Sequence, residues 1–273
     1  MPLPEDEKTW GDFDVMFAST RGTVRRNKLS DFVDVRRSGI IAMKLDEGEG
    51  IVDVQICTER DDVLLTSAGG QCIRFAVPEV RVFTGRTSMG VRGINLDTAD
   101  KLISLSILRH MESTADERAA YLKRASAVRR GEESSEDAAA DAEETTSASD
   151  SIELGETRYV EMSEAEQFVL TVSENGFGKR SSSYQYRTTG RGGKGIVAMS
   201  ITSKTGRLVA SFPVEESDQI MLVTNGGQLI RTQVNGIRLA GRSTQGVIVL
   251  DTADDERVVS VERLSEEGEE NGG

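Results

Sequence analysis

The sequence has few of the residues on which catalytic and metal sites depend. It holds one histidine, two cysteines and four prolines, and aromatic residues make up 5%. His110 has no partner that would complete a triad or a metal cluster, so we expect a passive surface residue. Cys57 and Cys72 lack CxxC spacing, which favours two buried, reduced thiols. These absences argue against a metal site, a disulfide scaffold and an independent enzyme.

Long apolar runs are also absent. The longest are strand-sized and far from the ~18 residues that a membrane-spanning helix needs. The first ten residues are acidic and lack the basic and apolar regions of a secretory leader. We therefore expect no membrane association and a cytoplasmic location.

Acidic charge dominates the chain but is unevenly placed. The formal net charge is −13, and residues 1–14, 112–166 and 254–273 carry −4, −10 and −6 of it. The remaining residues hold 24 basic and 17 acidic side chains. The patterned part of the chain is therefore basic, and the net charge does not exclude nucleic acid as a partner.

Two halves of a repeating unit recur along the chain. The first half is an apolar run, a turn with glycine, and a basic residue after it, at 13–26, 61–74, 166–180 and 218–231. The second half is a glycine-rich turn and a short apolar run, at 36–45, 85–96, 190–201 and 241–252. The second-half glycines Gly39, Gly90, Gly195 and Gly246 are 51, 105 and 51 residues apart, so the middle interval holds an insertion.

Each unit predicts two hairpins, because β-branched runs flank glycine-rich turns. Four short strands at a fixed period are typical of a propeller blade. We therefore predict an all-β fold, a β-propeller or β-pinwheel of about four four-stranded blades. Its expected segments are two blades over 1–110, an insertion over 111–165, two blades over 166–264 and an acidic tail over 265–273.

The insertion has two parts. Residues 117–130 are strong helix formers that follow a capping pattern at 113–116, so they predict a helix. Residues 131–151 are acidic, low in complexity and free of aromatics, which predicts disorder, and the tail has the same composition. Both acidic segments are expected either to compete with a nucleic-acid partner for the basic surface or only to aid solubility.

Several strings closely resemble the C-terminal domain of DNA gyrase A subunits. They are SENGFGKR (173–180), RGGKGIVAM (191–199), TSMGVRGINL (87–96), DQIMLVTNGGQLIRT (218–232) and GRSTQGVIVLDTADDERVVSVERL (241–264). The resemblance covers about 1–110 and 160–265. It implies a β-pinwheel of six four-stranded blades that exchange strands with their neighbours and bend DNA around a basic outer rim. The four blades counted here match the last four, so the chain is expected to be a fragment of the family's domain.

The resemblance also implies that this chain cleaves nothing by itself. The family's active-site tyrosine lies in a separate N-terminal domain, so Tyr121, Tyr159, Tyr184 and Tyr186 are not candidates. ATP is bound by the partner B subunit, and no GxxxxGK[ST] string occurs here. We expect no cofactor in this chain, with ATP and Mg acting elsewhere in the holoenzyme. Implied partners are double-stranded DNA, a second A subunit and the gyrase B subunit.

The second-half turns supply the candidate DNA-binding residues, because one basic loop per blade gives a row of charge for phosphates. They are Arg36, Arg37, Arg86, Arg92, Arg191, Gly192, Gly193, Lys194 and Arg242, with Lys44 nearby. The alternative is that they are solvated turn residues. The string 191–195 matches the last five positions of the family's Gln-basic-Arg-Gly-Gly-Lys-Gly wrapping signature, but Thr189 and Gly190 stand at the first two.

The first-half basic residues have a different expected role. Arg26, Arg74, Arg180 and Arg231 follow strand positions and are expected to pair with acids across the blade. Two other interpretations of the whole chain stay open. One is the C-terminal domain of a topoisomerase IV A subunit, which binds DNA with little wrapping, and the other is a protein-interaction propeller.

Overall fold

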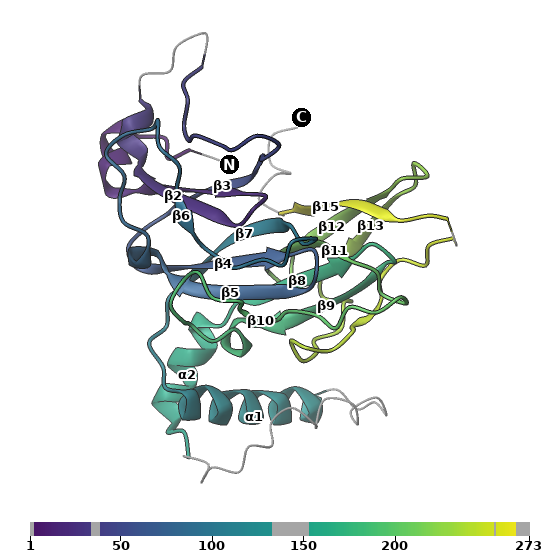
Figure 1. Cartoon of the computed structure of the whole chain (residues 1–273). Helices are drawn as coiled ribbons and strands as arrows, with labels where there is room; N and C mark the ends of the chain where they lie inside the picture. The colour runs from purple at the N-terminus through teal and green to yellow at the C-terminus, as the bar shows by residue number, and fades with distance from the viewer. Residues whose placement is uncertain (1–2, 34–38, 133–152, 254, 266–273) are drawn as a thin grey trace, which may run out of the picture.

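The computed structural model describes residues 3–33, 39–132, 153–253 and 255–265. They form four antiparallel sheets that lie side by side, with a helical insertion to one side of them (Figure 1). The sheets have the orders β3-β1-β2-β6, β7-β4-β5-β10, β11-β8-β9-β14 and β15-β12-β13, and we call them blades 1 to 4.

The strands are short, as the repeat predicts. Their bounds are β1 Asp14–Ser19, β2 Thr23–Lys28, β3 Ile51–Cys57, β4 Asp61–Ser67, β5 Gln71–Ala76, β6 Val91–Arg92, β7 Leu102–Arg109, β8 Phe168–Ser173, β9 Phe177–Ser182, β10 Ile196–Val197, β11 Leu208–Val214, β12 Gln219–Thr224, β13 Leu229–Gln233, β14 Val247–Ile248 and β15 Val258–Leu264. Four 3-10 turns accompany them, η1 Glu7–Asp12, η2 Leu29–Phe32, η3 Val77–Glu79 and η4 Ser183–Gln185.

Each blade contains one hairpin around a glycine in the left-handed region. Gly22, Gly70, Gly176 and Gly227 have φ of 80°, 85°, 77° and 82°. Only glycine adopts this backbone conformation without a steric cost, which is why it recurs in every unit. The predicted first-half hairpins are therefore confirmed as β1–β2, β4–β5, β8–β9 and β12–β13.

The second-half hairpins were predicted wrongly. The two-residue strands β6, β10 and β14 do not pair with the strand that follows them in sequence. Each pairs with the hairpin of the preceding blade, as in Val91 with Val24, Ile196 with Cys72 and Val247 with Gly178. The long strand that follows returns to the inner side of its own blade. Strand patterns identify the strands but not their partners, so the exchange followed only from the family resemblance.

The fourth sheet differs from the other three. In the part of the chain that the structure describes, β13 has β12 on one side and no strand on the other. The exposed side chain of Leu229 lies on this edge strand. The prediction of four-stranded blades is therefore confirmed for blades 1 to 3.

The core consists of apolar layers between neighbouring blades. Met16 and Phe75 belong to the layer between blades 1 and 2, Val169 and Tyr186 to the next, and Leu222 to the third. Removal of these side chains from water is the main stabilising contribution to the fold. Because each layer joins two blades, the blades fix each other's orientation and so position the outer strands.

The described part of the insertion contains two helices, α1 Ala115–Glu132 and α2 Glu156–Ala165. Thr114 and Glu117 form a reciprocal capping box, in which each side chain accepts from the other residue's backbone N–H. Tyr121 packs edge-on against Tyr184 of η4 at 5.0 Å, which fixes α1 to blade 3. The first helix was predicted and the second was not. The acidic segment expected to be disordered falls mostly outside the described residues, as does the tail from 266.

Candidate nucleic-acid interface

The exchanged strands make the outer edge of blades 1 to 3, and each is preceded by a loop from the following repeat. We call the three stretches 81–92, 187–197 and 238–248 the rim segments. Each starts beside the same position of the hairpin, through parallel bridges of Arg26 with Val82, Arg74 with Thr188 and Arg180 with Leu239. The topology therefore places three of the four predicted second-half turns on one repeating outer rim, and residues 36–38 of the other lie outside the described ranges.

Three predicted arginines, Arg86, Arg191 and Arg242, share one structural contact. Each half-buried side chain donates a hydrogen bond to the carbonyl of the third residue of the 3-10 turn in the preceding blade. The acceptors are Asp31 (3.2 Å), Glu79 (2.9 Å) and Gln185 (3.1 Å). Their recurrence thus has a structural cause, the docking of each rim segment on its neighbour. Contact of these arginines with DNA stays a prediction.

The predicted residues around the RGGKG string differ in whether their side chains or backbone groups are exposed and free to bind a ligand. Lys194 and Arg92 are exposed. Gly192, at φ 81°, donates its N–H to the Gly93 carbonyl at 2.6 Å, so this amide is already used within the protein. Gly193 is exposed and accepts from the Asn95 amide at 2.8 Å. Lys44 is exposed, whereas Arg36 and Arg37 lie outside the described residues.

The sequence reasoning missed a second set of rim arginines, Arg81, Arg187 and Arg238. Each lies eleven residues after a first-half glycine, 70 to 81, 176 to 187 and 227 to 238, so the repeat itself carried the signal. Arg81 and Arg187 are exposed and Arg238 is half-buried. They begin the rim segments, on the same edge as Lys194.

A hollow of about 270 Å³ lies beside the exchanged strand of blade 2. Arg187 and Lys194 line it together with Thr189 and the backbone of Gly193. Two cationic side chains from one rim segment therefore line the same surface hollow. Such a surface suits an anion of the size of a phosphate group.

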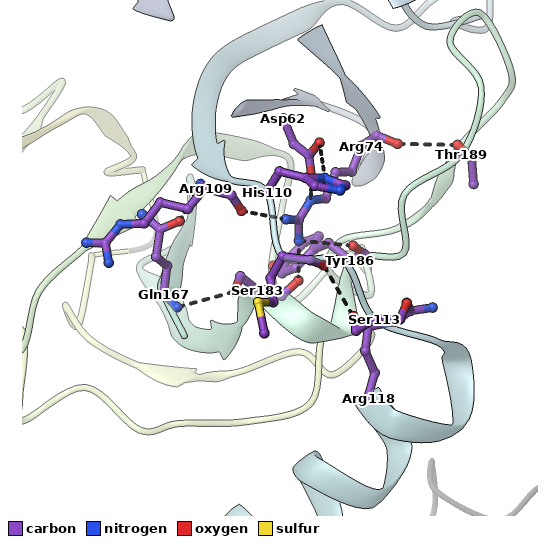
Figure 2. Close-up of polar contacts among 11 residues, drawn as sticks. Asp62, Arg74, Arg109, His110, Ser113, Arg118, Gln167, Ser183, Tyr186 and Thr189 are labelled. Atoms are coloured by element: carbon purple, nitrogen blue, oxygen red, sulfur yellow. Dashed lines mark hydrogen bonds and ion pairs between the residues drawn. The ribbon is translucent and has the colours of Figure 1, made fainter. Parts of the chain in front are cut away.

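The first-half arginines make buried contacts within the fold, as predicted, in the three blades that have an exchanged strand on their outer edge. Arg74 donates to Asp62 at 2.8 Å and to the Ser183 and Arg109 carbonyls at 2.9 and 3.0 Å (Figure 2). Arg26 pairs in the same way with buried Asp14 at 2.6 Å. Equivalent Arg180 donates to backbone carbonyls and Glu216. Arg231, on the edge strand β13, is exposed and donates to the Gln219 amide oxygen.

His110 is not the passive residue that was predicted. Its Nδ1 lies 2.9 Å from Oδ1 of Asp62, the carboxylate that also accepts from Arg74 (Figure 2). The side chain is 40% exposed, so it covers the buried carboxylate from the solvent side. The sequence could not show this contact, because 48 residues separate the two partners.

No cluster of three or more potential metal ligands occurs within the described ranges. Neither helix in this part of the chain has the length and apolar character of a membrane span. Burial raises the pKa of the Tyr184 hydroxyl to about 12, and this group donates to the Met162 carbonyl at 2.8 Å. Burial raises the pKa of Tyr121 and Tyr186 as well.

Both cysteines are buried and free, as predicted. Burial raises the pKa of Cys57 and of Cys72 to about 12, so the reactive thiolate is scarce at neutral pH. We expect neither thiol to react with iodoacetamide at pH 8 in the folded chain, and both to react in concentrated urea. Mass spectrometry of the alkylated protein measures this. Stoichiometric labelling of either cysteine before unfolding would contradict the buried positions.

Strand exchange between successive four-stranded sheets defines the class of fold, a β-propeller in which each blade is completed by its neighbour. Comparison with known families matches residues 14–58, 61–109, 167–215 and 218–265 to the family described as "DNA gyrase C-terminal domain, beta-propeller". The chain therefore belongs to this family. The four matched stretches are the four repeats found in the sequence.

Curated relatives agree with this assignment, and solved structures share the fold. The DNA gyrase A subunit of Granulibacter bethesdensis is 50% identical over 96% of this chain, and that of Rickettsia bellii is 42% identical over 99%. The chain spans only 28% and 29% of their lengths. Among solved structures, a DNA gyrase A C-terminal domain has a TM-score of 0.65 at 21% identity, covering 93% of this chain and 67% of that one. The C-terminal domain of a DNA topoisomerase IV has 0.68 at 18%, covering 97% and 64%.

Proposed function

We propose that this chain is a non-catalytic module of a gyrase A subunit that binds double-stranded DNA along its rim segments and bends it. One observation carries the proposal. The rim segments hold eight basic residues and no acidic one, in a chain whose net charge is −13. They are Arg81, Arg86, Arg92, Arg187, Arg191, Lys194, Arg238 and Arg242.

The repeat explains why such a rim suits DNA rather than a small ligand. Phosphates are recognised by charge, without reading base identity. Bending a site of 20–30 base pairs costs roughly 1–6 kcal/mol. Basic residues on successive blades distribute the contacts that offset this cost, whereas one patch would bind DNA without bending it.

The holoenzyme supplies what this chain lacks. In the proposed setting, a bacterial cytoplasm, a gyrase B subunit binds ATP, a second A subunit completes the assembly, and cleavage takes place in another domain. The wrapped DNA then supports negative supercoiling by the whole enzyme. The topoisomerase IV interpretation has weaker support, because the family match and the curated relatives named above are gyrase A, whereas the topoisomerase IV structure, at 18% identity, shows the fold alone.

The first test is a titration of the purified chain with duplex DNA of ~150 base pairs across a salt series. The parent chain is expected to bind more weakly as salt rises, with a slope of about −0.9 per phosphate contact. The Arg187→Glu/Lys194→Glu variant is expected to bind more weakly than the parent. Its slope is expected to be shallower by about two contacts, because both residues lie on the rim.

A matched control reverses the same charge away from the rim. Arg60 and Lys101 are exposed residues that directly precede strands β4 and β7 of blade 2, away from its outer edge. The Arg60→Glu/Lys101→Glu variant should keep the parent slope. Equal losses in both double variants would mean that only net charge matters. No binding of the parent at low salt would favour a protein-interaction scaffold.

A further inference from the structure

Two cations are buried beneath the rim segments rather than exposed on them. Lys179 of β9 is fully buried, and its ammonium donates to the carbonyls of Gly241 at 2.6 Å and Thr244 at 2.8 Å. It also donates to the Arg242 carbonyl and, at 3.4 Å, to the Thr244 hydroxyl. The acceptors belong to the rim segment on the outer edge of the same blade.

Arg25 of β2 makes the corresponding contacts in blade 1. It is fully buried and donates to the Ser88 carbonyl at 2.6 Å, to the Ser88 hydroxyl at 3.0 Å and to the Gly85 carbonyl. Arg25 and Lys179 both lie three residues after the hairpin glycine, 22 to 25 and 176 to 179. Gly85 and Gly241, like Ser88 and Thr244, hold equal places in the loop. Two blades therefore share one cage of carbonyls and a hydroxyl around a cation.

Blade 2 keeps the loop glycine, as Gly190, but lacks both the buried cation and the hydroxyl of this cage. Ile73 stands at the position of the cation, 70 to 73, and Gly193 stands where the other loops have Ser88 and Thr244. A Cβ added at Gly193 would lie 3.7 Å from the Ile73 δ-methyl, so the isoleucine packs directly under the loop backbone. The next residue is the exposed Lys194, where the other loops have methionine and glutamine.

A buried cation keeps its place only if its hydrogen-bond donors are satisfied. In blades 1 and 3, satisfying them requires several carbonyls of one short loop to converge, which holds the loop in one conformation. In blade 2 the side chain of Ile73 needs no hydrogen-bond acceptors. The loop above it has two glycines, Gly192 and Gly193, where the other loops have residues with side chains. Lys194, the residue after these glycines, can then extend into solvent.

We propose that Arg25 and Lys179 are positioning residues, which shape the rim segments of blades 1 and 3 for phosphate contact. In blade 2 the contact between Ile73 and Gly193 stands in place of the cage, and the basic residue of this loop, Lys194, is exposed at the surface. The rim therefore has two kinds of loop, and only the glycine kind carries an exposed lysine. The expected change in DNA binding rests on the proposed function. The expected change in hydrogen exchange does not.

Hydrogen exchange and DNA titration of the Lys179→Met variant test the cage. We expect amides in 241–246 to exchange at least tenfold faster, while those of the β4–β5 hairpin keep the parent rates. DNA affinity should fall and the salt slope should become shallower, because the rim arginines of this blade lose their placement. Unchanged exchange in 241–246 together with an unchanged slope would overturn the proposal.

A graft of the blade 2 arrangement onto blade 3 is the decisive partner variant. It combines Lys179→Ile, Ser243→Gly, Thr244→Gly and Gln245→Lys. We expect parent-like protection of 241–246 and a salt slope steeper than the parent by about one contact. An unprotected loop or an unfolded graft would overturn the proposal. This test remains valid even if the Lys179→Met variant does not fold. If the parent does not bind DNA, the proposed function fails, and hydrogen exchange alone then decides the positioning role.

Discussion

Replacement of Arg74 by methionine is expected to lower the free energy of unfolding by about 3–5 kcal/mol. Arg74 is 6% exposed, and its partner Asp62 is fully buried. Methionine keeps much of the apolar stem but leaves the carboxylate without its main partner. It also leaves the Ser183 and Arg109 carbonyls without the guanidinium that joins them. Since Ser183 belongs to the blade 3 repeat, the variant weakens the junction between blades 2 and 3.

Urea unfolding followed by circular dichroism measures this loss, and the repeat supplies a matched control. Arg231 stands at the same position of the hairpin in blade 4, but it is exposed on β13. Arg231→Met is expected to cost below about 1 kcal/mol, as surface substitutions usually do. Equal losses in the two variants would show that the buried network is not the source of the stability. A loss under about 1 kcal/mol in Arg74→Met would show the same.

The repeat made the number of blades and the hairpins predictable, because glycine spacing and strand length are local properties. The pairing of the outer strands was not local. Strand β6 has only two residues, and its place beside β2 depends on tertiary packing. Gly93, for example, lies so close to Leu65 and Val24 that a Cβ there would be 2.6 and 2.8 Å from their side chains. No periodicity in the sequence encodes such a contact.

The second helix was missed for a related reason. Helix α2 has only ten residues, and isolated helices of this length are marginal in water. Its Met162 is fully buried in the cluster that joins both helices to Tyr184. Tertiary packing therefore stabilises α2, whereas the capping box and strong helix formers of α1 could be recognised in the sequence.

The rim shows how far recurrence alone can guide the choice of binding residues. The prediction treated the repeated arginines as a sign of DNA contact, and the structure gives Arg86, Arg191 and Arg242 a docking role on backbone carbonyls. The exposed Arg187 recurs with equal regularity and was overlooked. The cage around Lys179 could not be predicted, because its acceptors are mostly carbonyls, which every residue has.

Replacement of Gly176 by alanine is expected to destabilise the chain by about 2–5 kcal/mol in total. Gly176 has a φ of 77°, where a residue with a Cβ pays about 1–2 kcal/mol. The new Cβ would also lie 1.9 Å from the Leu250 carbonyl oxygen, and relief of such overpacking costs about 1–3 kcal/mol more. The strand β14 must then move. The hydrogen bond from the Val249 amide to the Gly176 carbonyl, 2.8 Å long, would be strained with it.

The same substitution in blade 4 separates the two causes. Gly227 has a φ of 82°, but a Cβ there would meet no atom within 4 Å among the described residues. Gly227→Ala should therefore show the conformational cost alone, about 1–2 kcal/mol in urea unfolding. The difference between the two losses of unfolding free energy measures how closely the hairpin turn packs against the exchanged strand β14. Equal costs would mean that β14 shifts freely, and the rim segment of blade 3 would then lack the fixed placement that the proposed DNA bending requires.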